Sequence, residues 1–149
     1  MSLETTVNTA IKTAMLNKQE VALRALRAIK SALLIAKTEK GATEILSEET
    51  EIKVLQKLIK QRKESAEIYQ TQNRPDLYQI ETDEAEVIEQ YLPQQLSPKE
   101  IKLAITQIIQ NLNITSIKEM GKVMAAANVQ MAGKADGKTI SEAIKAILK

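Results

Sequence analysis

The stretch MGKVMAAANVQMAGKADGK, from Met120 to Lys138, joins a run of small and apolar residues to a loop whose charges lie between glycines. Its apolar residues recur at helical spacing and predict one soft apolar face, made of Met120, Met124, Ala127 and Met131. Gly133 is typical of a helix C-terminus. Asp136 stands just before the next apolar repeat and is expected to cap the helix that follows. The stretch therefore predicts two helices joined by a short, charged loop.

Two pairs of lysines lie in or beside this stretch. Lys118 and Lys122 are one helical turn apart, and Lys134 and Lys138 flank Asp136. Because the free N–H groups of a helix N-terminus favour anions, the second pair indicates a phosphate site. The alternative is that Asp136 only satisfies its own helix and the lysines are solvated. The methionine face likewise has two readings, as core or as contact surface.

The composition excludes several kinds of chemistry. The chain has 149 residues, which suffices for one domain or two small ones, and it contains neither cysteine nor histidine. It therefore has no disulfide, no thiolate nucleophile, and neither the most common general base nor the most common metal ligand. Aromatic side chains are limited to three tyrosines, which argues against binding of single strands by base stacking.

The charges are distributed unevenly along the chain. Residues 1–40 hold seven basic and three acidic residues, residues 64–93 one and eight, and residues 94–149 eight and four. Such polarity would steer a basic end toward a polyanion, although surface charge also serves solubility. The N-terminal sequence includes Glu4 and has no long apolar run, so we expect neither a secretory signal nor a membrane span. We expect a cytoplasmic protein without membrane association.

Helical patterns cover the first part of the chain. Ser2 is expected to cap a first helix that reaches Met15, and a second helix ends near Gly41. On this second helix a basic row is either a solvated face or a nucleic-acid track, and it consists of Arg24, Arg27 and Lys30. A third helix starts at Ser47. Arg62 interrupts its apolar period, either with its stem along an apolar surface or with its head on a carboxylate of a neighbouring helix.

A fourth helix follows the break at Pro75 and ends at Leu92 and Pro93. Its acidic side has the spacing of a solvated helix face, and it consists of Glu81, Asp83, Glu84 and Glu86. Without a histidine beside these carboxylates, we expect no metal site there.

A short hinge, Gln94 to Leu96, is expected between two domains, 1–93 and 94–149. Ser97 and Glu100 then form a capping box around Pro98, and Ser116 with Glu119 repeats the box. These patterns predict an all-α protein, with four helices in the first domain and a compact three-helix tail.

Catalytic signatures such as a phosphate-binding loop or a nucleophile elbow are missing from the sequence. Six pieces in matching order nevertheless resemble the YqeY family, the small GatB/YqeY-like proteins. They are LRALRAIKSAL (23–33), KQRKESAEIY (60–69), NRPDL (73–77), EVIEQYLPQQLS (86–97), MGKVM (120–124) and GKADGK (133–138). The resemblance extends along nearly the whole chain.

In its C-terminal part this family is similar to the tail domain of the B subunit of the glutamine-dependent aspartyl/glutamyl-tRNA amidotransferase. The resemblance implies a three-helix tail that contacts tRNA, and a carbon–nitrogen ligase activity with glutamine as amido-N-donor. The catalytic domain and the glutaminase subunit of that enzyme have no counterpart in this chain, so we transfer binding and not catalysis. The matching tail positions are Gly121, Lys122, Gly133, Lys134, Asp136, Gly137 and Lys138.

The sequence thus predicts a non-catalytic tRNA-binding or amidotransferase-like accessory protein without cofactor or metal. Its expected partners are tRNA and an aminoacyl-tRNA synthetase or amidotransferase component. The predicted RNA-binding residues are Lys118, Lys122, Lys134, Lys138, Gly121, Gly133, Gly137, Arg24, Arg27 and Lys30. The first alternative is a helical adaptor that binds a protein through its methionine or small-residue face. The second is a true glutamine-dependent ligase.

Overall fold

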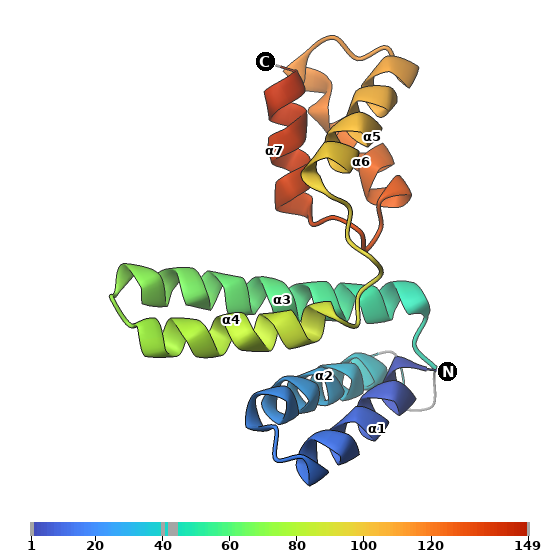
Figure 1. The fold of residues 1–149 in the computed structure, drawn as a ribbon. Helices are drawn as coiled ribbons and strands as arrows, with labels where there is room; N and C mark the ends of the chain where they lie inside the picture. Colours follow the sequence, from blue (N-terminus) through green and yellow to red (C-terminus); the bar gives the residue numbers. More distant parts are fainter. Residues whose placement is uncertain (1, 40, 42–44, 149) are drawn as a thin grey trace. The chain divides into compact units, whose positions relative to one another are not determined.

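The protein is helical throughout the part of the chain that the structure describes. The computed structural model describes residues 2–39, 41 and 45–148, and these contain seven α-helices, one short 3-10 helix and no strand (Figure 1). The all-α prediction is therefore confirmed. Contacts divide the chain between Leu92 and Pro93 into two bodies, here the first body, with α1–α4, and the second body, with α5–α7. That each folds as an independent domain, 1–93 and 94–149, stays a prediction.

The first body consists of two helical hairpins, α1 (Leu3–Leu16) with α2 (Glu20–Glu39) and α3 (Glu48–Thr71) with α4 (Pro75–Glu89) (Figure 1). The turns after α1 and α3 each contain a residue in the left-handed region, Lys18 at φ 55° and Asn73 at φ 57°. An apolar core joins the hairpins, and its fully buried large side chains are Val7, Ile29, Leu55 and Ile88.

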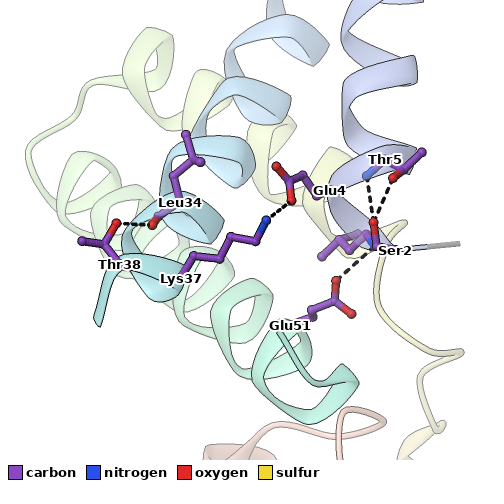
Figure 2. Close-up of polar contacts among 8 residues, drawn as sticks. Ser2, Glu4, Thr5, Leu34, Lys37, Thr38 and Glu51 are labelled. Carbon is purple, nitrogen blue, oxygen red and sulfur yellow. Dashed lines mark hydrogen bonds and ion pairs between the residues drawn. The ribbon is translucent and has the colours of Figure 1, made fainter. Parts of the chain in front are cut away.

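Polar contacts fix the start of α1. Ser2 is its N-cap and accepts a hydrogen bond from the Thr5 N–H at 3.2 Å, as expected from the sequence. Figure 2 shows the two links from this end to the neighbouring helices. The Leu3 N–H donates to Oε2 of Glu51 on α3 at 3.0 Å, and Lys37 on α2 binds the Glu4 carboxylate at 2.6 Å. Two orphan donors of the first turn, the N–H groups of Leu3 and Thr5, are thus satisfied.

The acidic side of α4 differs from the sequence prediction. Glu84 was expected on a solvated face, but it is buried at 9% exposure. Its carboxylate lies 3.3 Å from Nε of Arg24 on α2 and 3.8 Å from Nε of Arg62 on α3. A buried carboxylate needs such partners, because desolvation without them is costly. Of the two readings of Arg62, the structure supports the carboxylate on a neighbouring helix.

The second body packs α5 (Pro98–Asn111), α6 (Met120–Gln130) and α7 (Gly137–Ile147) around one core (Figure 1). The capping box is present at α5: Ser97 Oγ accepts from the Glu100 N–H at 3.2 Å, and the Glu100 side chain accepts from the Ser97 N–H. The core includes the fully buried side chains of Ile105, Val123, Met131, Ile140 and Ile144.

The expected second capping box is wrong. Ser116 Oγ accepts from the Lys118 N–H at 3.2 Å and starts a 3-10 helix, Ile117–Glu119. A bond to an N–H only two residues on, and not three, fits the tighter 3-10 turn. Glu119 is the N-cap of α6 without a side-chain cap bond, and its carboxylate contacts Lys122 instead.

The methionine face of α6 belongs to the core. Met131 is buried at 1% exposure, and Met120 and Met124 are partly buried against the same cluster. Of the two readings offered by the sequence, the structure therefore supports core packing. These methionines would offer a protein partner little contact area, because they already pack in or against the core.

Candidate nucleic-acid interface

The loop between α6 and α7 is held by the segment that precedes α5. Gln95 Nε2 donates to the carbonyl oxygens of Gly133 at 2.6 Å and Pro93 at 2.8 Å. The Leu96 N–H donates to the Lys134 carbonyl at 2.9 Å. Two of the three residues of the predicted hinge, Gln94 to Leu96, are thus bonded to a loop of the same body, and motion at this segment stays a prediction. The sequence offered no signal for these contacts, because the residues that each bond joins are 38 positions apart.

The backbone of the loop is fixed from within as well. Gly133 lies in the left-handed region at φ 75°, which is the conformation expected of a glycine after a helix. The Lys134 N–H bonds to the Met131 carbonyl at 2.9 Å, and Ala135 is buried at 8% exposure. With its backbone and its alanine turned inward, the loop leaves the Lys134 side chain exposed.

Asp136 is the N-cap of α7, as predicted. One carboxylate oxygen accepts from the Thr139 N–H at 2.8 Å. Lys134 and Lys138 are both exposed, and neither forms an ion pair with a described residue. The cap leaves other N–H groups of the first turn for an anion, so both readings of this end agree with the geometry.

The other pair of lysines lies at the start of α6. Lys118 is exposed and has no ion pair within the described ranges, whereas Lys122 contacts Glu119 at 3.5 Å. The Lys122 side chain is 70% exposed, so water screens this contact and a stronger anion can replace it. The structure places these two lysines in the same three-helix body as Lys134 and Lys138, and we call the four the tail lysines.

Three glycines accompany the tail lysines. Gly133 is buried, whereas Gly121 and Gly137 are exposed in the first turns of α6 and α7. A Cβ at Gly121 or Gly137 would meet nothing within 4 Å. Packing among the described residues therefore does not require glycine at these two positions, and they leave the backbone of both first turns open to an approaching group.

The basic row of α2 lies in the first body and is not uniform. Arg24 is engaged with the buried Glu84, so its charge is partly offset. Arg27 and Lys30 are exposed and have no ion pair with a described residue. Two of the three positions are thus available to a polyanion, and Arg24 has a structural role in addition.

Two carboxyl groups of the first body, those of Glu81 and Asp76, have shifted pKa values. Burial raises the pKa of the Glu81 carboxyl, and repulsion by Glu84 adds to the increase. The hydrogen bond from Arg74 lowers the pKa of Asp76. No group of three or more metal-ligating side chains is found among the described residues. Within the same ranges, no helix combines the length and the apolar character needed to cross a membrane.

Comparison with known proteins agrees with the resemblance noted in the sequence. A family model described as "Yqey-like protein" matches residues 4–148. A protein of Meyerozyma guilliermondii named "Altered inheritance of mitochondria protein 41, mitochondrial" is 39% identical over 95 residues, which cover 60% of this chain and 47% of the relative. The protein of the same name in Clavispora lusitaniae is 34% identical over 105 residues, or 68% of this chain and 59% of the relative.

The chain thus spans about half the length of the curated relatives that it matches. The names of both relatives include the word mitochondrial, whereas we expected a cytoplasmic protein from the sequence. That word describes the relatives, and the compartment of this chain stays a prediction.

Proposed function

This chain belongs to the YqeY-like family, and from this premise we propose that it is a non-catalytic accessory protein that binds the backbone of tRNA. The observation that carries the proposal is the exposure of the tail lysines on one small body. Three of them, Lys118, Lys134 and Lys138, have no ion pair with a described residue. The second body therefore presents cations that are not neutralised internally.

The chemistry of the surroundings favours a polyanion over an apolar ligand. Residues 94–149 hold eight lysines against four carboxylates. One of these four, Asp136, is hydrogen-bonded to its own helix, and Glu119 has the screened contact with Lys122. Lysine acts on a phosphate as a point charge and carries no base-specific geometry. The proposed contact therefore reads the shape and charge of RNA and not its sequence.

The open glycines support the same mode of binding. Gly121 lies one residue before Lys122 and Gly137 one residue before Lys138. Without a Cβ at either position, a ribose-phosphate backbone can come close to the first turn, where free N–H groups add to the lysine charge. Arg27 and Lys30 of the first body are proposed as a second, weaker contact. Arg24 contributes only the part of its charge that Glu84 does not offset.

The test is binding of the purified protein to bulk tRNA across a salt series. A variant with the four tail lysines changed to alanine is compared with the wild type. Each phosphate contact that is lost should reduce the slope of log K against log salt by about 1, so the slope should flatten by roughly 3 to 4. Affinity at low salt should decrease steeply in the same variant.

A matched variant separates these contacts from net charge. Lys12, Lys53, Lys57 and Lys60 are exposed lysines of the first body, and their replacement by alanine removes the same charge. We expect this control to retain most of the slope. Equal losses in both variants, or no binding at low salt, would show that the tail lysines are not the RNA site.

The same measurement discriminates the alternatives. An adaptor that binds protein through an apolar face is indifferent to these lysines and to salt. A glutamine-dependent ligase would form product from glutamine, ATP and an acceptor tRNA in a steady-state assay, which we expect to give no turnover. The proposal implies a protein partner, either an aminoacyl-tRNA synthetase or an amidotransferase component. Co-purification of such a protein with this chain in the presence of tRNA tests it.

A further inference from the structure

The first body contains a groove that the proposed RNA contact does not use. It lies between α1, the start of α2 and the C-terminal half of α4, and its volume is about 780 Å³. Apolar side chains from all three helices line it: Ala10, Ala22 and Val87 are partly exposed, whereas Ala14 and Leu26 are buried. This volume falls within the range of sites that take sizeable ligands, roughly 300–1,000 Å³.

The charged side chains that line this groove are all acidic. Three carboxylates lie among its lining residues, Glu20, Asp83 and Glu86. None of the described residues that line it is a lysine or an arginine. Glu20 and Glu86 are exposed and have no ion pair within the described part of the chain, while Asp83 accepts a hydrogen bond from Gln79 at 2.7 Å. The groove therefore repels a nucleic acid and attracts a cation.

The lining combines apolar side chains with carboxylates, and this combination limits the kind of partner that fits. A small, strongly hydrated cation would leave the partly exposed Ala10, Ala22 and Val87 uncovered, whereas an apolar ligand would leave the carboxylates unpaired. Both needs are met by apolar side chains flanked by lysine or arginine at helical spacing. The walls are helices and the described residues contain no strand edge, so insertion of a helix into the groove is the available mode, and strand addition is not.

We propose that this groove binds a basic amphipathic helix of a partner protein. The apolar face of that helix contacts Ala10, Ala22 and Val87, and its cations pair with Glu20, Asp83 and Glu86. Tyr91, also in the lining, offers an aromatic ring to one of the cations. The two bodies then bind different classes of partner, a polyanion at the tail lysines and a basic protein segment at the groove.

The probe for the test is a synthetic 18-residue peptide of leucine and lysine that forms a basic amphipathic helix. Two peptides serve as ligand controls, one of the same composition with the apolar face scrambled and one with glutamate in place of lysine. Binding to the full chain is measured by fluorescence anisotropy at physiological salt. We expect micromolar affinity for the amphipathic peptide and at least tenfold weaker binding of both controls.

Two groove variants locate the site. The triple variant E20Q/D83N/E86Q keeps side-chain size and should weaken binding at least tenfold. Gln90, an exposed residue in the lining, is changed to arginine in the second variant, which adds a repelling charge without altering the core. A matched triple, E48Q/E64Q/E142Q, changes exposed carboxylates elsewhere by the same net charge and should retain affinity within twofold.

Several outcomes overturn the proposal. Equal affinity for the amphipathic and scrambled peptides would reduce the effect to net charge, and equal losses in the two triple variants would place the site elsewhere. Failure of the peptide to bind at millimolar concentration also contradicts it. Self-association by analytical ultracentrifugation that disappears in Q90R would assign the groove to a second copy of this chain. None of these outcomes affects the tRNA test, whose variants lie outside the groove.

Discussion

Arg24 on α2 donates from Nε to Oε1 of Glu84 on α4 across 3.3 Å. The other carboxylate oxygen of Glu84 lies 3.8 Å from Nε of Arg62 on α3, an atom that is buried and has no hydrogen bond in the described structure. One carboxylate therefore joins three helices of the first body. It also supplies the nearby negative charge that a largely buried guanidinium requires.

Replacement of Glu84 by glutamine should destabilise the first body. The change keeps the size of the side chain but removes the charge beside Arg62, so we expect a loss of about 1–3 kcal/mol in the free energy of unfolding. Urea denaturation followed by circular dichroism measures it. The control is K53Q, which removes the exposed pair of Lys53 with Glu49 and should cost less than about 0.5 kcal/mol. Similar losses in both variants would show that the buried Glu84 contributes no more to the free energy of unfolding than an exposed ion pair does.

The raised pKa of Glu81 predicts a pH dependence of stability. Burial is the main cause, repulsion by Glu84 adds to it, and attraction by Arg62 opposes it. The folded chain then holds this proton more tightly than the unfolded chain, so the free energy of unfolding decreases as pH rises from the ordinary pKa to the raised one.

We therefore expect E81Q to be more stable than the wild type near neutral pH. The advantage should vanish below about pH 4, where the carboxyl is protonated in both states. Because Glu81 is only partly buried, the difference should stay below about 1 kcal/mol. Thermal unfolding of both proteins across this pH range measures it. An advantage of E81Q that persists at low pH would trace to packing and contradict the electrostatic cause.

Asp136 predicts a helix-cap effect in the second body. Replacement by alanine removes the acceptor of the Thr139 N–H at the start of α7, which should cost about 1 kcal/mol. Replacement by asparagine or serine keeps an acceptor and should cost little. Denaturation of the three variants checks this order. If alanine and asparagine were equally destabilising, charge at the helix N-terminus would outweigh the hydrogen bond.

Local patterns in the sequence predicted what local contacts determine. The caps Ser2, Ser97 and Asp136 are visible in a window of four residues, because each cap bonds to a backbone N–H three residues on. The helical class followed from the apolar periodicity, which is also a local pattern. The all-α class and the ends of most helices were therefore accessible without a structure.

Contacts between distant segments were not accessible. Glu84 looked like any exposed glutamate of α4, because its partners Arg24 and Arg62 are 60 and 22 positions away and helical spacing does not reveal them. The bond from Gln95 to Gly133 also joins distant segments, 38 positions apart. The Ser116 box failed because serine can close a 3-10 turn as well as an α-helix, and the same letters fit both.

The three glycines of the second body predict opposite effects of alanine. Gly133 is at φ 75°, where a Cβ is strained, so G133A should destabilise the body by about 1–2 kcal/mol. At Gly121 and Gly137 a Cβ meets nothing within 4 Å, so alanine there should be neutral or stabilising by up to about 1 kcal/mol. If a ribose-phosphate backbone approaches these two turns, G121A and G137A should nevertheless weaken tRNA binding without loss of stability. Stability and tRNA affinity measured on the same preparations decide this, and unchanged affinity in both variants would confine the RNA contact to the lysine side chains.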